Sequence, residues 1–354
     1  MRVSIILLLT LLFSFNLASA QPFAYINNGN DNSVSVIDCA TNTVITTIPV
    51  GTLPFGISVF PNGNFVYVGN FDDDTISVIN TFTNNVVTTI NVGDEPSGIA
   101  VTPDSATAYV GSQEDSELTV INTANHQVLG TIPLIGPTQG VAVSPDGTRV
   151  YVANITTDML SIIDIATNTV IDVVPSGNTP VMPSVRPDNA FVYMTNQVGS
   201  SVSVFSTVNN ALVDTINIGT TPGALTFTPD GSFLYAANQI DDTISVIRTS
   251  DNTVIQTING GDQPFGVSVT PVGDFVYVTN NRDDNVSVIR VSDNTIVDTI
   301  PVGDRPFSFG PFITNGPNLV SAVPTISEWG LISLVIVMGI AGFIAIRRKS
   351  AVQS

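Results

Sequence analysis

The seven tyrosines of this 354-residue chain are evenly spaced, each 42 residues after the one before. They are Tyr25, Tyr67, Tyr109, Tyr151, Tyr193, Tyr235 and Tyr277. No tyrosine lies outside the series, so the chain contains one unit copied seven times. A repeat of this length predicts an architecture in which each unit buries its core against its neighbours.

Each unit contains four short runs that follow the two-residue period of β-strands and are rich in Val, Ile, Thr and Phe. In one copy the runs are Gly56–Pro61, Phe65–Asn70, Thr75–Asn80 and Val86–Val92. Segments such as Pro-Asp-Gly and Gly-Asp-x-Pro separate the runs and favour tight turns. Four antiparallel strands in about 40 residues are typical of a β-propeller blade. We therefore predict an all-β, seven-bladed β-propeller over residues 21–315.

The two ends of the repeat array are complementary. The array opens with a second strand, Phe23–Asn28, and ends with a lone first strand, Ser308–Ile313. We expect the C-terminal strand to complete the N-terminal blade, which closes the ring and leaves no open edge. In such a ring the tyrosines are packing residues between blades.

The strand that carries the tyrosine has a recognisable motif. Tyr-Val-Thr-Asn occurs at Tyr277–Asn280, and other units have YVGN, YVAN, YMTN or YAAN. The repeat resembles the YVTN family of propeller repeats, which occurs in bacterial and archaeal surface proteins, and the resemblance covers about residues 22–313. Ser112 replaces the asparagine in one unit, and residues 180–186 depart from the usual first strand. The segment VSPDGTRVYVAN (residues 143–154) is also similar to lactonase-type propellers, but in residues that form the fold.

Both ends of the chain indicate export. Residues 1–20 have one basic residue, an apolar run and then Ala-Ser-Ala, which predicts a secretory signal peptide cleaved after Ala20. Residues 329–346 contain no charge and are just long enough to cross a bilayer, so we predict a transmembrane helix there, after a linker at 316–323. The basic residues that follow it, Arg347 to Lys349, are expected in the cytoplasm.

The C-terminal region, residues 324–354, resembles the IPTL-type sorting signal of Gram-negative bacteria. The resemblance rests on one set of positions in order: Pro324, Thr325, Trp329, Gly330, Arg347 and Arg348. It implies an exosortase-type processing protease as a partner, a transient anchor in the inner membrane, and delivery to the cell surface or extracellular matrix. A permanent membrane anchor is the alternative, and both place the propeller outside the cell.

The charge of the chain excludes one class of partner. Residues 21–323 contain six arginines and no lysine, and the whole chain has a formal net charge of −19. Nucleic-acid binding depends on Lys and Arg that neutralise phosphates, so no nucleic acid is expected as a partner. Such a surface attracts cations and basic partners instead.

Many of the acids are expected on one face, where the second-to-third turns and the fourth-to-first links of a propeller emerge. The candidate residues for binding a ligand or cation are Asp72, Asp73, Asp74, Glu114, Asp115, Asp241, Asp242, Asp283 and Asp284. Carboxylates grouped with Asn and backbone oxygens suit Ca²⁺, although no turn has the spacing of a Ca²⁺-binding loop. Ca²⁺ is therefore the one cofactor that the sequence suggests. The alternative is that Asp and Asn simply suit turns and keep the surface solvated.

Signals for catalysis are few. His126 is the only histidine, which argues against multi-histidine metal or haem centres, and it is expected as a solvated turn residue on the opposite face. Cys39 is the only cysteine and is expected as a small buried hydrophobe. Arg186 ends a first strand and is a candidate for the mouth of the central channel, either as an anion contact or paired with a nearby Asp.

These observations favour an exported binding or structural module whose acidic face engages a protein, glycan or cation. The alternative is a secreted hydrolase of lactonase type on the same fold. The sequence names no catalytic residue for it, and an enzyme would need convergent polar groups with shifted pKa values.

Overall fold

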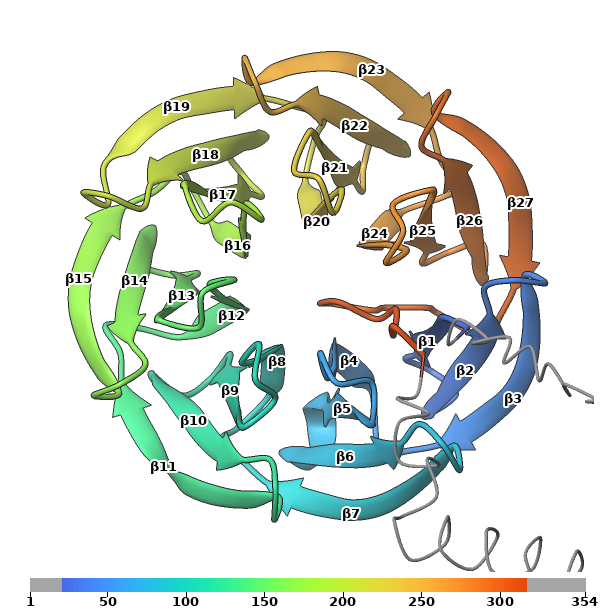
Figure 1. The fold of residues 1–354 in the computed structure, drawn as a ribbon, viewed down its shortest axis with the longest axis horizontal. Coiled ribbons are helices and arrows are strands. Elements are labelled where there is room, and N and C mark those ends of the chain that lie inside the picture. The colour runs from blue at the N-terminus through green and yellow to red at the C-terminus, as the bar shows by residue number, and fades with distance from the viewer. Residues whose placement is uncertain (1–20, 317–354) are drawn as a thin grey trace, which may run out of the picture. The chain divides into compact units, whose positions relative to one another are not determined.

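The computed structural model describes residues 21–316, which form seven antiparallel sheets arranged as the blades of a ring (Figure 1). Blade 1 contains three named strands and each of the other six blades contains four. The seven-bladed propeller predicted from the tyrosine spacing is confirmed. One short 3₁₀ helix, η1 (Phe71–Asp73), lies in a turn of blade 2.

The strands occupy four concentric positions (Figure 1). The innermost are β4 (Pro54–Val59), β8 (Pro96–Val101), β12 (Thr138–Val143), β16 (Pro180–Val185), β20 (Pro222–Phe227) and β24 (Pro264–Val269). The second are β1 (Phe23–Asn28), β5 (Phe65–Asn70), β9 (Thr107–Ser112), β13 (Arg149–Asn154), β17 (Phe191–Asn196), β21 (Phe233–Asn238) and β25 (Phe275–Asn280). The third are β2 (Ser33–Asp38), β6 (Thr75–Asn80), β10 (Glu117–Asn122), β14 (Met159–Asp164), β18 (Ser201–Ser206), β22 (Thr243–Arg248) and β26 (Asn285–Arg290). The outermost are β3 (Thr43–Pro49), β7 (Asn85–Asn91), β11 (Gln127–Pro133), β15 (Thr169–Pro175), β19 (Leu212–Asn217), β23 (Thr253–Asn259) and β27 (Thr295–Pro301).

The ring is closed by the C-terminal segment, as expected. The backbone N–H of Tyr25 donates to the carbonyl of Phe312 at 2.9 Å, so the segment pairs with β1 and supplies the innermost strand of blade 1. The same segment also pairs with β4 of blade 2, where the N–H of Ile57 donates to the carbonyl of Phe309 at 3.1 Å. Residues 21–316 therefore contain every element of a complete ring, and we expect this part to fold on its own.

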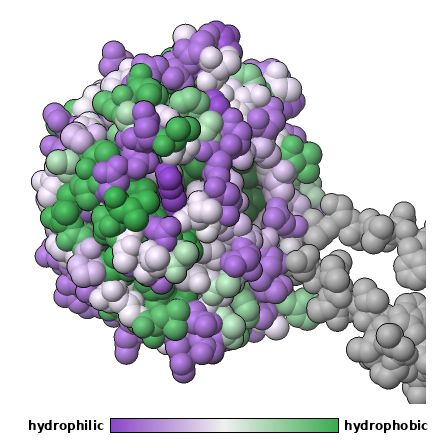
Figure 2. Space-filling view, turned by 60° about the vertical axis from the view of Figure 1, so that its left-hand side comes forward, coloured by the Kyte–Doolittle hydropathy of each residue, from purple (hydrophilic) through white to green (hydrophobic). Residues whose placement is uncertain are grey.

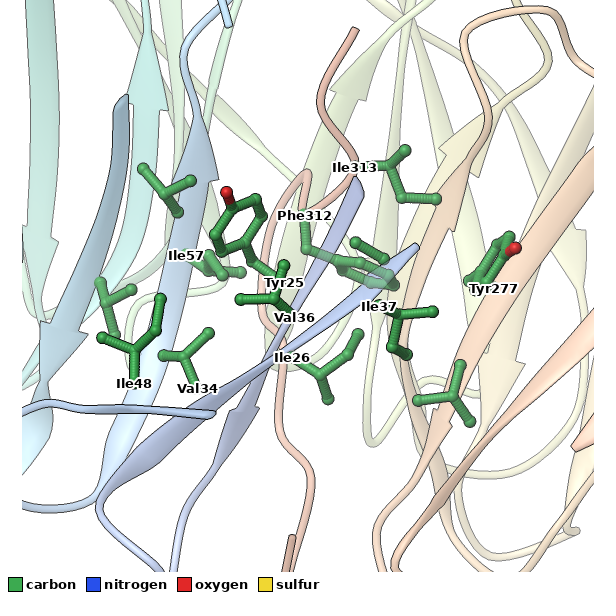
Figure 3. Packing of buried hydrophobic residues seen from close by; sticks show 14 of the residues in the cluster. Tyr25, Ile26, Val34, Val36, Ile37, Ile48, Ile57, Tyr277, Phe312 and Ile313 are labelled. Atoms are coloured by element: carbon green, nitrogen blue, oxygen red, sulfur yellow. The ribbon is translucent and has the colours of Figure 1, made fainter. Parts of the chain in front are cut away.

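Apolar side chains from both sides of the closure form one core. Phe312 is fully buried and Ile313 nearly so, and both pack with residues of blades 1, 2 and 7. Figure 3 shows Phe312 within this cluster, with Tyr25 and Ile57 towards blade 2 and Tyr277 towards blade 7. The closing segment is thus an integral part of the hydrophobic core.

All seven repeated tyrosines are buried, and six of their hydroxyls meet a side chain of the next blade. The Tyr25 hydroxyl donates to Asn84 Oδ1 in the next blade at 2.8 Å, and Tyr277 donates to Asn42 Oδ1 across the ring closure at 2.6 Å. The equivalent pairs in other blades are Tyr109 with Asn168, Tyr193 with Asn252 and Tyr235 with Asn294. Burial raises the pKa of Tyr109 and of Tyr235 to about 12, so these hydroxyls remain protonated donors at neutral pH.

The signal peptide at 1–20, the linker and tail from 317 onward and the transmembrane helix at 329–346 lie outside the described residues. In residues 21–316 no helix has the length and apolar character needed to cross a bilayer.

Candidate functional site

The second-to-third turns and the fourth-to-first links lie together on one face, because hydrogen bonds join them. In blade 2, Asp73 Oδ2 accepts the N–H of Thr52 in the link that enters the blade, at 2.6 Å. The neighbouring Asp74 Oδ1 accepts the N–H of Glu95 in the link that leaves it, at 3.0 Å. Two adjacent carboxylates therefore hold both links of one blade. We call this side of the ring the acidic face.

The same two positions are used around the ring. At the first position the acceptors are Asp31, Asp115, Asp241 and Asp283, and each takes an N–H from the link entering its blade. At the second position the acceptors are Asn32, Asp158, Asp242 and Asp284. Most of the candidate binding carboxylates are therefore hydrogen-bonded to backbone amides of the links.

In five of the seven blades, the asparagine that ends the second strand explains the glycine of the link. Asn70 Oδ1 accepts the N–H of Gly51 at 3.0 Å, while its Nδ2 donates to Thr75 and Ser77. A Cβ atom on Gly51 would lie 2.5 Å from Asn70 Cγ, so only glycine fits beside this amide. The Asn of the repeat motif thus has a structural function.

A smaller group of acids accepts no hydrogen bond at its carboxylate oxygens within residues 21–316. Asp72, Asp94, Glu95 and Glu114 come from the turns and links of blades 2 and 3, and none of their carboxylates accepts a hydrogen bond there. Partial burial raises the pKa of Glu95, and the negative charges of Glu114, Asp72, Asp74 and Asp94 raise it further. Glu95 thus lies within electrostatic range of the other three, and we call this group the free acid cluster (Asp72, Asp94, Glu95, Glu114).

The described residues contain no group of three or more His, Cys, Asp or Glu side chains placed to hold a metal ion. Two arginines interrupt the acids at blade 7: Arg282 is exposed in its second-to-third turn, next to Asp283, and Arg305 is exposed in the link that leaves it, next to Asp304. The guanidinium of Arg305 lies 4.9 Å from the centre of the Phe307 ring. Sequence reasoning missed these two arginines, although their positions in the repeat place them on this face.

Arg186 is not among the residues that line the central cavity. Its guanidinium forms an ion pair with Asp188 at 2.6 Å and lies 4.6 Å from the centre of the Phe191 ring. These contacts turn the side chain outward, towards the turn of blade 6 at Asp230. A short ion pair with its own hairpin therefore determines where this arginine points.

An aromatic cluster that sequence reasoning missed packs between the innermost strands, at their ends towards the acidic face. Phe55, Phe265, Phe307 and Phe309 have ring centres 4.8 to 5.7 Å apart. The sequence signal was a phenylalanine directly after the proline of three innermost strands, at residues 55, 265 and 307. The buried Met182 packs with this cluster.

A cavity of about 330 Å³ occupies the other end of the channel, towards the turns that join first and second strands. Its lining is mainly Val, Ile, Ala and Pro from the innermost strands. The only polar side chains among the described lining residues are Ser58, Ser184, Thr226 and Asn315, and none is charged. No acid or base is therefore among the described residues that line this cavity.

His126 takes in blade 3 the position that asparagine has in the other six blades, and its φ of 57° matches theirs. Its Nδ1 lies 2.8 Å from the Tyr67 hydroxyl and its ring packs edge-on against Phe65. His126 lies in a third-to-fourth turn, as expected, but its side chain is only partly exposed, because the adjacent blade brings Tyr67 to it. Cys39 is half-buried, and burial raises the pKa of its thiol to about 12.

The partly buried position of His126 beside Tyr67 predicts that the stability of the protein depends on pH. Burial lowers the pKa of His126, so the unfolded chain binds the proton more readily than the folded one. The contribution of His126 to the free energy of unfolding should therefore be at its maximum above the ordinary histidine pKa of about 6.5. It should decrease as the pH falls below that value. His126→Asn keeps an acceptor for Tyr67 and should abolish this part of the dependence. Urea unfolding of both proteins on either side of that pH measures it, and an unchanged slope in the variant would refute the assignment.

Comparisons with known proteins agree with the fold and the tail. Residues 209–297 match the family described as "Lactonase, 7-bladed beta-propeller", which covers less than half of the chain. Residues 321–348 match the "IPTL-CTERM motif", which confirms the expected sorting signal. No curated protein matches the chain.

Two solved structures have a similar fold. A chain of hydrazine synthase from Kuenenia stuttgartiensis is 20% identical with a TM-score of 0.65, and the match covers 72% of this chain and 88% of that one. A functionally unknown protein from Desulfotomaculum acetoxidans is 17% identical with a TM-score of 0.69, and the match covers 81% and 99% of the two chains. At these identities the likeness concerns the propeller alone. The chain is thus a seven-bladed propeller with a C-terminal sorting motif, which indicates export.

Proposed function

We propose that this protein acts at the cell surface or in the extracellular matrix of a Gram-negative bacterium as a binding or structural module. The sorting motif supports delivery to the outside and processing by an exosortase-type protease that removes residues following the propeller. The signal-peptide features of residues 1–20 agree with this route. The propeller is the part that remains to function after processing.

The acidic face is the surface that we propose engages a partner, which would be a protein or glycan carrying basic groups or bound cations. The observation that carries this proposal is the division of the acids into two sets. Asp73 and Asp74 accept hydrogen bonds from the links, whereas no carboxylate of the free acid cluster accepts a hydrogen bond within residues 21–316. Carboxylates that surround Glu95 and accept no internal hydrogen bond favour a basic or cationic ligand.

An oligolysine peptide tests this surface as a model basic partner. We expect residues 21–316 to bind it, with an affinity that falls as salt screens the charges. Replacing two free acids, Asp72→Asn with Glu114→Gln, should weaken binding by about tenfold, as expected for a loss of about 1.4 kcal/mol. Isothermal titration calorimetry measures the affinity.

The control removes the same charge from the opposite face. Asp38→Asn with Asp146→Asn also lowers the net negative charge by two, and asparagine keeps an acceptor for the turn bonds of both residues. This pair should bind the peptide nearly as the unchanged protein does. Equal weakening by both pairs would mean that only net charge matters, and the acidic face would lose its special role.

Ca²⁺ is tested separately by thermal melting, with the ion or with a chelator at matched ionic strength. A ligand present at 100 times its Kd stabilises by about 2.7 kcal/mol, which raises the melting temperature measurably. We expect a rise that the Asp72→Asn, Glu114→Gln pair reduces. An identical melting temperature with and without Ca²⁺ would restrict the proposal to basic partners.

A secreted hydrolase of lactonase type is the second candidate, favoured by the family match over residues 209–297. Such an enzyme needs an acid or base close to a bound substrate. The central cavity offers none among its described lining residues, so an active site of this kind would have to use carboxylates of the acidic face. Hydrolysis of simple lactones by the unchanged protein, lost in Asp72→Asn with Glu114→Gln, would favour this candidate.

A further inference from the structure

The outermost strand of every blade contains a β-bulge at the same place. In blade 2, Thr88 pairs with Val78 and Val86 pairs with Ile79, so Val87 between them has no partner on β6. The bulge residues of the seven blades are Ile45, Val87, Leu129, Ile171, Val213, Ile255 and Val297. All seven are large aliphatic residues.

These bulge residues are exposed. Their relative exposure runs from 40% for Ile255 to 63% for Leu129, although neighbouring Val and Ile residues of the third strands are fully buried. A bulge residue makes no ladder pair, so the sheet does not require an aliphatic side chain there. Figure 2, which turns the side of β11, β15 and β19 forward, shows hydrophobic residues gathered on that part of the outer surface. The propeller core therefore does not account for this apolar outer surface.

Blades 1 to 3 lack charge on this surface as well. Strands β3, β7 and β11 and the turns before them, residues 39–42, 81–84 and 123–126, contain no Asp, Glu, Lys or Arg. We call their exposed large side chains the apolar rim: Val44, Ile45, Phe82, Val87, Val128 and Leu129. Blades 6 and 7 differ, because the corresponding turns carry the ion pairs Arg248–Asp251 and Arg290–Asp293.

We propose that the apolar rim is a self-association surface on which a second copy of this chain docks through the same rim, with β7 at its centre. The choice of occupant follows from charge. A strongly acidic chain repels its own copies wherever carboxylates face one another, and the rim of blades 1 to 3 is a wide uncharged stretch of its outer surface. A basic partner would be drawn to the acidic face instead.

The outer strands also leave backbone groups without sheet partners, since no strand within residues 21–316 pairs with the outer edges of β3, β7 or β11. Proteins usually protect such edges with Lys, Pro or bulges. Here the bulge interrupts the edge, which limits continuous strand pairing, and at the same time turns an aliphatic side chain outward. The contact therefore depends on Phe82 and Val87 packing against the same residues of the second copy, as in a two-fold interface.

Sedimentation velocity of residues 21–316 over a range of protein concentrations tests the proposal. We expect a concentration-dependent dimer that is strengthened by added salt, because salt screens the repulsion between acidic copies and leaves apolar contacts intact. Val87→Lys should raise the dissociation constant at least about tenfold, since a two-fold contact places the change twice at its centre.

Val297→Lys is the matched control, because Val297 is the bulge residue of blade 7 and is exposed to a similar degree, 41% against 52% for Val87. It should associate like the unchanged protein, and both variants should melt at similar temperatures. A monomer at every concentration would overturn the proposal. Equal weakening by both variants, or association that salt abolishes, would overturn it too. These outcomes are independent of peptide or Ca²⁺ binding at the acidic face.

Discussion

A chain that ends at Arg305 is expected not to form a stable propeller, whereas a chain that ends at Gly316 is expected to fold. The last eleven described residues supply the innermost strand of blade 1, including Phe309 and Phe312, both fully buried. They also satisfy backbone donors on two blades, Tyr25 of β1 and Ile57 of β4.

The expected loss is comparable to the whole stability of the protein. Removing one buried phenylalanine side chain costs about 3–5 kcal/mol, and folded proteins are stable by only about 5–15 kcal/mol. Loss of both rings together with exposure of two strand edges should therefore give an unfolded or aggregated chain.

Thermal denaturation followed by circular dichroism, with the two chain lengths in parallel, measures this effect. Phe312→Ala in the chain ending at Gly316 provides an intermediate and should lower the free energy of unfolding by about 3–5 kcal/mol. A cooperative transition at the same temperature for both lengths would show that the ring does not depend on its closing segment.

Gly56→Ala is expected to destabilise the propeller by about 3 kcal/mol, near the upper end for overpacked sites. A Cβ atom at this position of β4 would lie 2.0 Å from the carbonyl oxygen of Ser97 in the neighbouring blade. Gly140 of β12 stands in the same relation to Val181, at 2.2 Å. Since the obstacle is backbone, the innermost strands would have to move apart.

The repeat itself provides the matched control. Ala224 occupies the same position in β20 of blade 6 and is buried, so this blade already accommodates a Cβ atom. Ala224→Gly should cost at most about 1 kcal/mol, the entropy of the added glycine. Urea unfolding of both variants gives the comparison. If Gly56→Ala were as stable as the unchanged protein, the innermost strands would have more freedom than their spacing indicates.

The fold was predictable because its information is local. Each strand follows a two-residue period, each turn contains Gly, Pro, Asn or Asp, and the tyrosine marks the unit every 42 residues. Counting seven units and noticing a second strand at one end and a first strand at the other was enough to predict a closed ring. The sorting motif was readable for the same reason, since its residues occur together in a short segment.

The site was only partly predictable, because the contacts that define it join residues far apart in the chain. Sequence reasoning placed Asp72, Asp73 and Asp74 on one face as equivalent candidates. The structure separates them, because the link at Thr52, 21 residues earlier, meets Asp73 and the link at Glu95 meets Asp74, while Asp72 is left free.

The amino-acid sequence by itself therefore determined the fold class, the number of blades, the way the ring closes and the sorting signal at the end of the chain. Tertiary structure alone decided which acids hold the links and that His126 Nδ1 meets the hydroxyl of a tyrosine 59 residues earlier. It also decided that a bulge turns one aliphatic residue of each blade outward. The physical reason is the range of the interactions: periodicity and turn chemistry act between near neighbours, whereas the links and His126 meet their partners only once the blades have packed against one another.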